Sequence, residues 1–208
     1  MTLVASAILV VVVVFDGSVW AQSQEGPTSP LPAANELTLP GAPRFSTDAA
    51  LQRAYTDVFN VLREPNACSD FYGGPTIATT VLKEYFASLS KERLPEYVAF
   101  LMRGKSINVY DLTGHVAFRL FETTVVNTEG AFYQGRTTSH EHRVPNIGPF
   151  LPGTRRARTL GLLHELGHLI RAADGQWLLP DDGNDPDKSR RNTRTIQKIC
   201  EPALRRVN

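Results

Sequence analysis

The residues best suited to carry chemistry are His164, Glu165 and His168, which form the pattern H-E-x-x-H in a leucine-rich segment. Residues four apart on a helix project from the same face, with Cβ atoms about 5–6 Å apart. Two imidazoles placed in this way can bind one ion at the usual Zn–N distance of about 2.0–2.1 Å. A glutamate beside the first histidine can accept a proton from water held by that ion. The pattern therefore predicts a zinc site in which Glu165 is the general base.

The segment that carries this pattern is typical of an amphipathic helix. Thr154, which follows Pro152-Gly153, suits the N-cap, and Asp174-Gly175 offers a C-terminal stop. On a helical wheel the two histidines lie on one half, and the apolar residues fill a continuous arc on the other. These apolar residues are Leu160, Leu162, Leu163, Leu166, Leu169 and Ile170. We expect the apolar face to pack on a core and the histidine face to carry the site.

In this H-E-x-x-H helix the chain resembles the zincin metallopeptidases, and the resemblance covers the helix and at most the strands before it. It implies a small sheet packed on the active-site helix, with an edge strand to which an extended peptide can pair. It also implies hydrolysis of a peptide or protein substrate by zinc-activated water, with Glu165 as base and then as proton donor to the leaving amine. Tyr133 and Arg171 are candidates for binding the oxyanion or a substrate carboxylate.

A catalytic zinc normally has three protein ligands and one water, so a third ligand is expected. Several acidic residues are candidates for it. Metzincin-like chains place a ligand six residues after the second histidine, where this chain has Asp174, but their glycine three residues after it is Arg171 here. Gluzincin-like chains take a glutamate from a following helix. The only glutamate there is Glu201, which precedes Pro202 and points away from the inward face expected for the last helix.

The segment between the two helices, 178–187, contains four of the candidate aspartates: Asp181, Asp182, Asp185 and Asp187. We rank Asp185 first as the third ligand, Asp182 second and Asp174 third. The alternative is that these residues form turns, with Asp187 or Ser189 as N-cap of a last helix from about 189 to 200. Calcium binding is a weaker alternative, because no EF-hand pattern follows. Asn192, on the expected inward face, is suited to bonding the metal helix or orienting a ligand.

Two further histidines, His140 and His142, would share a face if their segment were a strand, and could then form a second metal-binding pair. The Pro- and Gly-rich segment that follows, 145–153, favours an exposed loop instead. That segment leads into the metal helix and can serve as a rim or lid of the site.

The chain divides into three parts by composition. Residues 1–21 contain a long apolar run that ends at Val19-Trp20-Ala21 and predict a signal peptide cut near Ala21, although no Lys or Arg precedes the run. The run is shorter than the roughly 20 residues of a membrane span, so we expect an exported protein without stable membrane insertion. Residues 22–44 are a Pro-rich linker that we expect to be disordered. Residues 45–208 are expected to form a single zincin-like metallopeptidase domain.

Within this domain, the expected order of elements is helices, then strands, then the metal helix and a last helix. Apolar spacing predicts helices over 46–63 and 77–89 around a turn at 68–75. Two hairpins are predicted from strands 107–111, 116–121, 123–127 and 131–133. The predicted fold class is α+β, with a small sheet packed on the H-E-x-x-H helix and on a second, C-terminal helix.

The two cysteines, Cys68 and Cys200, most simply form one disulfide in an exported chain. They are isolated rather than paired in C-x-x-C, which disfavours metal ligation. The net charge of +1 gives no reason to propose a nucleic-acid partner. The alternative to an active peptidase is a catalytically inactive zincin-like structural or binding module held by this disulfide.

Overall fold

The computed structural model of the chain describes residues 48–95, 97–136, 143–183 and 185–207. In these residues five helices and three strands follow one another as α1 (Ala49–Leu62), α2 (Ala67–Phe71), α3 (Pro75–Ala87), β1 (Leu89–Glu92), β2 (Phe100–Tyr110), β3 (Val116–Asn127), α4 (Arg155–Gly167) and α5 (Pro186–Leu204). The predicted α+β class is confirmed. The predicted signal peptide, the linker 22–44 and the pair His140 and His142 lie outside the described residues.

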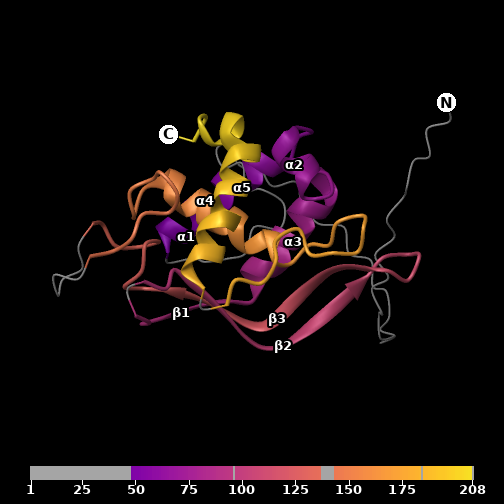
Figure 1. Ribbon diagram of the computed structural model, residues 1–208, viewed down its shortest axis with the longest axis horizontal. Coiled ribbons are helices and arrows are strands. Elements are labelled where there is room, and N and C mark those ends of the chain that lie inside the picture. Colours follow the sequence, from indigo (N-terminus) through magenta and orange to yellow (C-terminus); the bar gives the residue numbers. More distant parts are fainter. Residues whose placement is uncertain (1–47, 96, 137–142, 184, 208) are drawn as a thin grey trace, which may run out of the picture.

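The sheet is mixed and has the strand order β1-β3-β2. Strand β3 is central, antiparallel to β2 and parallel to β1. The helices lie on one side of this sheet (Figure 1). The predicted hairpin over 107–121 is therefore confirmed, and both of its strands are longer than predicted.

The second predicted hairpin is wrong, because β3 runs without a break to Asn127 and 131–133 forms turns. The buried side chain of Asn127 ends the strand by accepting from the N–H groups of Leu94 and Glu129 at 2.8 and 2.9 Å. The backbone N–H of Tyr133 then donates to the carbonyl of Gly130 at 3.1 Å, which closes a turn. The segment 68–75, predicted as a turn, overlaps the short helix α2, which has a capping box at Asn66.

Helix α4 begins as predicted and ends earlier than predicted. The Thr154 hydroxyl caps its start by accepting from the backbone N–H of Ala157 at 3.3 Å. Its end is at Gly167 rather than near Asp174, because the chain then turns to pair with β3. The N–H of Arg119 donates to the carbonyl of Leu169 at 2.8 Å. These contacts anchor the C-terminal end of α4 against the sheet.

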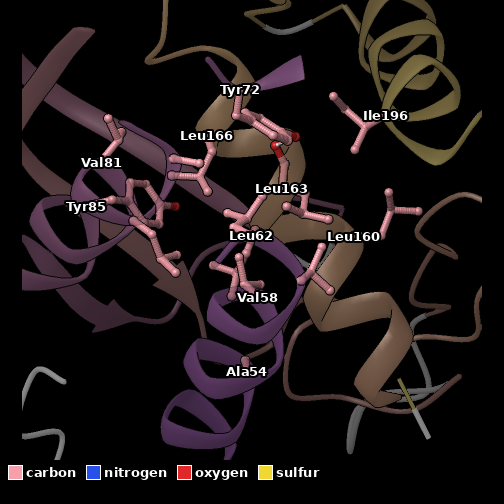
Figure 2. Close-up of a cluster of buried hydrophobic side chains, with 14 of the residues drawn as sticks. Ala54, Val58, Leu62, Tyr72, Val81, Tyr85, Leu160, Leu163, Leu166 and Ile196 are labelled. Atoms are coloured by element: carbon pink, nitrogen blue, oxygen red, sulfur yellow. Dashed lines mark hydrogen bonds between the residues drawn. The ribbon is translucent and has the colours of Figure 1, made fainter. Parts of the chain in front are cut away.

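The core lies where α1, α3 and α5 surround α4 (Figure 2). The predicted apolar face of α4 is confirmed, since Leu160, Leu163 and Leu166 are fully buried. Val58 and Leu62 of α1 and Ile196 of α5 pack on it. One face of α4 is thus held firmly, which leaves its histidines on the opposite face in fixed positions.

The predicted disulfide between Cys68 and Cys200 is confirmed. It joins α2 to α5 across a sequence separation of 132 residues, with the two Cα atoms 4.6 Å apart. In the chain-entropy model a closed loop of this length stabilises the fold by about 5 kcal/mol. The last helix is therefore covalently tied to the N-terminal helices. No helix in the described part of the chain combines the length and apolar character needed to cross a bilayer.

Candidate metal centre

The two histidines of the H-E-x-x-H pattern lie together at the C-terminal end of α4. His168 follows the last helical residue but keeps helical backbone angles (φ −78°, ψ −15°), so the spacing of four residues still places both rings on one face. The Nε2 atoms of His164 and His168 are 3.1 Å apart, and each residue is 5% exposed. The predicted metal-binding pair is therefore brought together, on the side of α4 opposite its core face.

Asp182 completes a group of three whose ligand atoms all lie within 4.8 Å of one another. Its Oδ2 is 3.1 Å from Nε2 of His164, and its Oδ1 is 3.5 Å from Nε2 of His168. Ligand atoms on a tetrahedral ion with bonds of about 2.0–2.1 Å lie about 3.3 Å apart. Two imidazole nitrogens and one carboxylate are also the donor set of many catalytic zinc sites. The residues present thus fit a zinc ion.

The charge distribution of the group suits a cation as well. Burial alone would raise the pKa of Asp182, but hydrogen bonds from His164 and His168 hold it well below its usual value. Burial likewise opposes protonation of His168, yet the Asp182 and Glu165 carboxylates raise the pKa of its imidazole overall. The Asp182 carboxylate therefore places negative charge at the point where the two imidazole Nε2 atoms meet.

Asp185 and Asp174, ranked first and third by sequence, occupy other positions. The Asp185 carboxylate caps α5 by accepting from the N–H groups of Asp187 and Lys188 at 2.9 and 3.1 Å. Helix α5 starts at Pro186 rather than near 189, which turns the preferred ligand into a cap. Asp174 is exposed and accepts from the N–H of Gln176 in a turn. The structure brings Asp182, the second-ranked candidate, to the histidines.

Glu165 is partly buried, and the charges of His164, His168 and Asp182 act on its carboxyl. Burial raises the pKa of its carboxyl, although the neighbouring His164 and His168 act in the opposite direction. Its negative charge also adds to the burial that raises the pKa of Tyr85. In the ion-free protein, burial therefore favours the protonated form of this carboxyl, while the two imidazoles favour the carboxylate.

Asp182 is carried by the segment 178–183, here called the ligand loop, which is held at three successive residues. Leu179 packs so closely on Gly167 that a Cβ there would come within 2.6 Å of its side chain, and its N–H donates to the Gly167 carbonyl at 2.9 Å. The Pro180 carbonyl accepts from Nδ2 of Asn192 at 2.9 Å. The Asp181 carboxylate pairs with Arg119.

Arg119 of β3 joins the ligand loop to α4, and sequence reasoning missed it. Its Nε donates to the carbonyl of His168 at 2.9 Å while another guanidinium nitrogen bonds Asp181. The guanidinium also lies 4.1 Å from the ring centre of Trp177. Arg119 is 8% exposed, so its charge is balanced within the protein. The only sequence signal was a charged residue within an apolar strand.

Helix α5 contributes two successive side chains to the surroundings of the site. Asn192 is buried, as predicted, and it orients the ligand loop through Pro180. Thr193, which sequence reasoning missed, has its Oγ1 3.0 Å from Nδ1 of His164. Phase along the helix could have indicated Thr193, because it lies one position from Asn192 and one turn before Ile196.

The two residues suggested for substrate contact differ in their availability. The hydroxyl of Tyr133 donates to Asp48, the N-cap of α1, at 2.8 Å, so it serves the packing of that helix. Arg171 is exposed and stacks 4.8 Å from the centre of the Trp177 ring. Glu201 forms a surface ion pair with Arg205.

No protein-family model, curated protein or solved structure matches this chain. The chemistry of the centre is accordingly inferred from its own residues.

Proposed function

We propose that the protein is an exported zinc-dependent metallopeptidase, with His164, His168 and Asp182 as zinc ligands and Glu165 as general base. The observation that carries this proposal is the convergence of the two Nε2 atoms and the Asp182 carboxylate at 3.1–3.5 Å. The group has three members within the described residues, which matches a catalytic zinc with one position left for water.

In the proposed reaction, bound zinc would lower the pKa of a water molecule and polarise the carbonyl of the scissile peptide. The Glu165 carboxylate accepts the proton of that water and then delivers it to the leaving amine.

The arrangement of α4 on the sheet is proposed to be zincin-like. Support comes from the bridge between Phe118 of β3 and Ile170, which fastens the segment just after the metal helix to the central strand. An extended peptide or protein substrate paired to a strand edge is the binding mode we propose with it. No nucleic acid and no stable membrane insertion are part of the proposal.

Export is proposed on two grounds. The apolar segment before Ala21 has the composition of a signal peptide. The Cys68–Cys200 disulfide supports this location, because disulfides persist mainly in oxidising compartments.

A second candidate is an inactive module in which zinc only cross-links α4 and the ligand loop. The low exposure of both histidines, 5% each, favours this reading over an open active site. It predicts one zinc per chain, loss of thermal stability on chelation, and no turnover.

The test is the zinc content, by plasma mass spectrometry, of protein purified without chelator. We expect about one zinc per chain in the wild type, loss of zinc in His164→Ala and Asp182→Asn, and retention in Asp185→Asn, which can still cap α5. Zinc kept by Asp182→Asn and lost by Asp185→Asn would instead make Asp185 the ligand. A wild type that takes up no zinc when offered it would contradict the metal centre.

Turnover of an unfolded protein substrate separates the two candidates. Glu165→Gln should keep its zinc and lose about 100-fold or more of the activity, as expected for removal of a general base. Zinc-loaded wild type without turnover on a range of unfolded proteins would favour the inactive module.

A further inference from the structure

The partner of His164 on the side away from the metal group is a hydroxyl of α5. Nδ1 of His164 lies 3.0 Å from Oγ1 of Thr193, and Oγ1 in turn lies 2.9 Å from the carbonyl of Ser189, one turn earlier. A carbonyl can only accept, so the Thr193 hydroxyl donates its single proton to the Ser189 carbonyl. The lone pairs of Oγ1 are then free to accept from the imidazole.

The protonation pattern of a metal-bound histidine makes this contact meaningful. When Nε2 binds a cation it carries no proton, and the neutral ring must carry its proton on Nδ1. Because His164 is 5% exposed, that N–H needs a protein acceptor. Thr193 Oγ1 is the acceptor at hydrogen-bond distance.

The hydroxyl is held in place by a well-anchored element. Three residues after Thr193, Ile196 is fully buried and packs toward α4 (Figure 2). Cys200 then ties the same helix to α2 through the disulfide. The neighbouring Asn192 side chain donates a hydrogen bond to Pro180 of the ligand loop. The same turn of α5 therefore reaches both the first histidine and the segment that carries Asp182.

We propose that Thr193 is a positioning residue for His164: its hydroxyl accepts the Nδ1 proton and selects the tautomer whose Nε2 faces Asp182 and the ion. This inference rests on the proposed metal centre. In the metal-free protein, His164 can instead protonate Nε2 and bond Asp182, 3.1 Å away. Loss of the Thr193 hydroxyl therefore weakens the metal-bound form more than the metal-free form.

The test is zinc affinity, measured by competition with a chromophoric chelator, in Thr193→Val, Thr193→Ser and Thr195→Val. Valine keeps the shape of threonine and removes the acceptor, so Thr193→Val should bind zinc about 10–100-fold more weakly. Serine restores the hydroxyl and should return the affinity to within about threefold of wild type. Thr195 is a matched control, because its exposed hydroxyl makes the same local bond, to Arg191 at 3.2 Å.

A second readout separates positioning from simple stabilisation. With zinc bound, ¹⁵N NMR should show the proton of His164 on Nδ1, and chelator-treated Thr193→Val should unfold at the same urea concentration as Thr195→Val. Equal zinc affinities for Thr193→Val and Thr195→Val would overturn the inference. So would a wild type that binds no zinc, which would also remove the metal centre. If Thr193→Val binds zinc more weakly but the wild type shows no turnover, the inference is supported. Only the peptidase proposal is then contradicted.

Discussion

Helix α4 and the ligand loop both supply proposed zinc ligands, but they position them by different means. His164 lies on α4 and His168 directly follows it with helical backbone angles, while the other face of the helix, including Leu163, is buried in the core. Asp182 stands on an irregular segment whose neighbouring residues are gripped by α4, α5 and β3. The spacing of the histidines is therefore fixed locally, while the place of the carboxylate depends on distant parts of the chain.

The two histidines and the Asp182 carboxylate should therefore be lost through different substitutions. A substitution on the core face of α4 lowers the free energy of unfolding. It does not change the spacing of the histidines wherever the helix forms. Damage to the contacts of the ligand loop leaves most of the core in place and moves one ligand. Stability of the zinc-free protein and zinc affinity are thus the two quantities to compare.

The largest expected effect comes from Leu163→Ala, which leaves a cavity on the fully buried face of α4. We expect the free energy of unfolding of zinc-free protein to fall by about 2–5 kcal/mol, measured by urea titration with chelator present. Leu112→Ala is the control, because Leu112 is 50% exposed and should change stability by less than about 0.5 kcal/mol. Zinc affinity should change little in folded Leu163→Ala protein; a loss as large as that in Asp182→Asn would contradict the separation.

The second effect comes from Arg119→Met, which keeps the apolar stem but releases the ligand loop. We expect the free energy of unfolding to fall by about 2 kcal/mol, because the hydrogen bonds of Arg119 and its stacking on Trp177 are lost. Zinc affinity, measured by chelator competition, should fall at least about tenfold. Arg171→Met is the matched control, since Arg171 stacks on the same ring but is exposed. If both variants weakened zinc binding equally, the bridge from Arg119 to Asp181 would have no role in the site.

The smallest effects come from the two helix caps, which lie at different distances from the site. Thr154→Ala removes the cap of α4 far from its histidines and should lower stability by about 1 kcal/mol without changing zinc affinity. Asp185→Ala uncaps α5 three residues after Asp182 and should weaken zinc binding a few-fold. Calorimetric titration with zinc measures the zinc affinity of both variants. A change of zinc affinity in Thr154→Ala, with none in Asp185→Ala, would reverse the expected dependence on position.

The features of the site that the sequence predicted are those that follow from the helical repeat of one segment, α4. Thr154, the apolar face of α4 and the two histidines follow from helical spacing, and all lie as predicted. The end of α4 was placed too late because the bond from the Arg119 N–H to the Leu169 carbonyl is a tertiary contact with β3. Helical spacing carries no information about such a contact.

The rest of the site escaped prediction because it depends on where separate elements meet. Asp185 ranked above Asp182 by sequence, but α5 starts at Pro186 rather than near 189, and this start makes Asp185 its cap. Arg119 belongs to a strand whose own pattern gave no sign of a metal group, and Thr193 was missed although it is adjacent to Asn192 on α5. The burial of Asn192 was predicted correctly, because it depends on the phase of α5 alone.

The disulfide between Cys68 and Cys200 encloses every strand of the sheet, the whole of α4 and the ligand loop within one covalent ring. A single cut in the backbone anywhere between residues 69 and 199 therefore opens the ring without releasing a fragment. A molecule nicked once in this region stays in one piece, and its two parts separate on a denaturing gel only when a reducing agent is added. One nick in this part of the chain therefore does not by itself divide the proposed site.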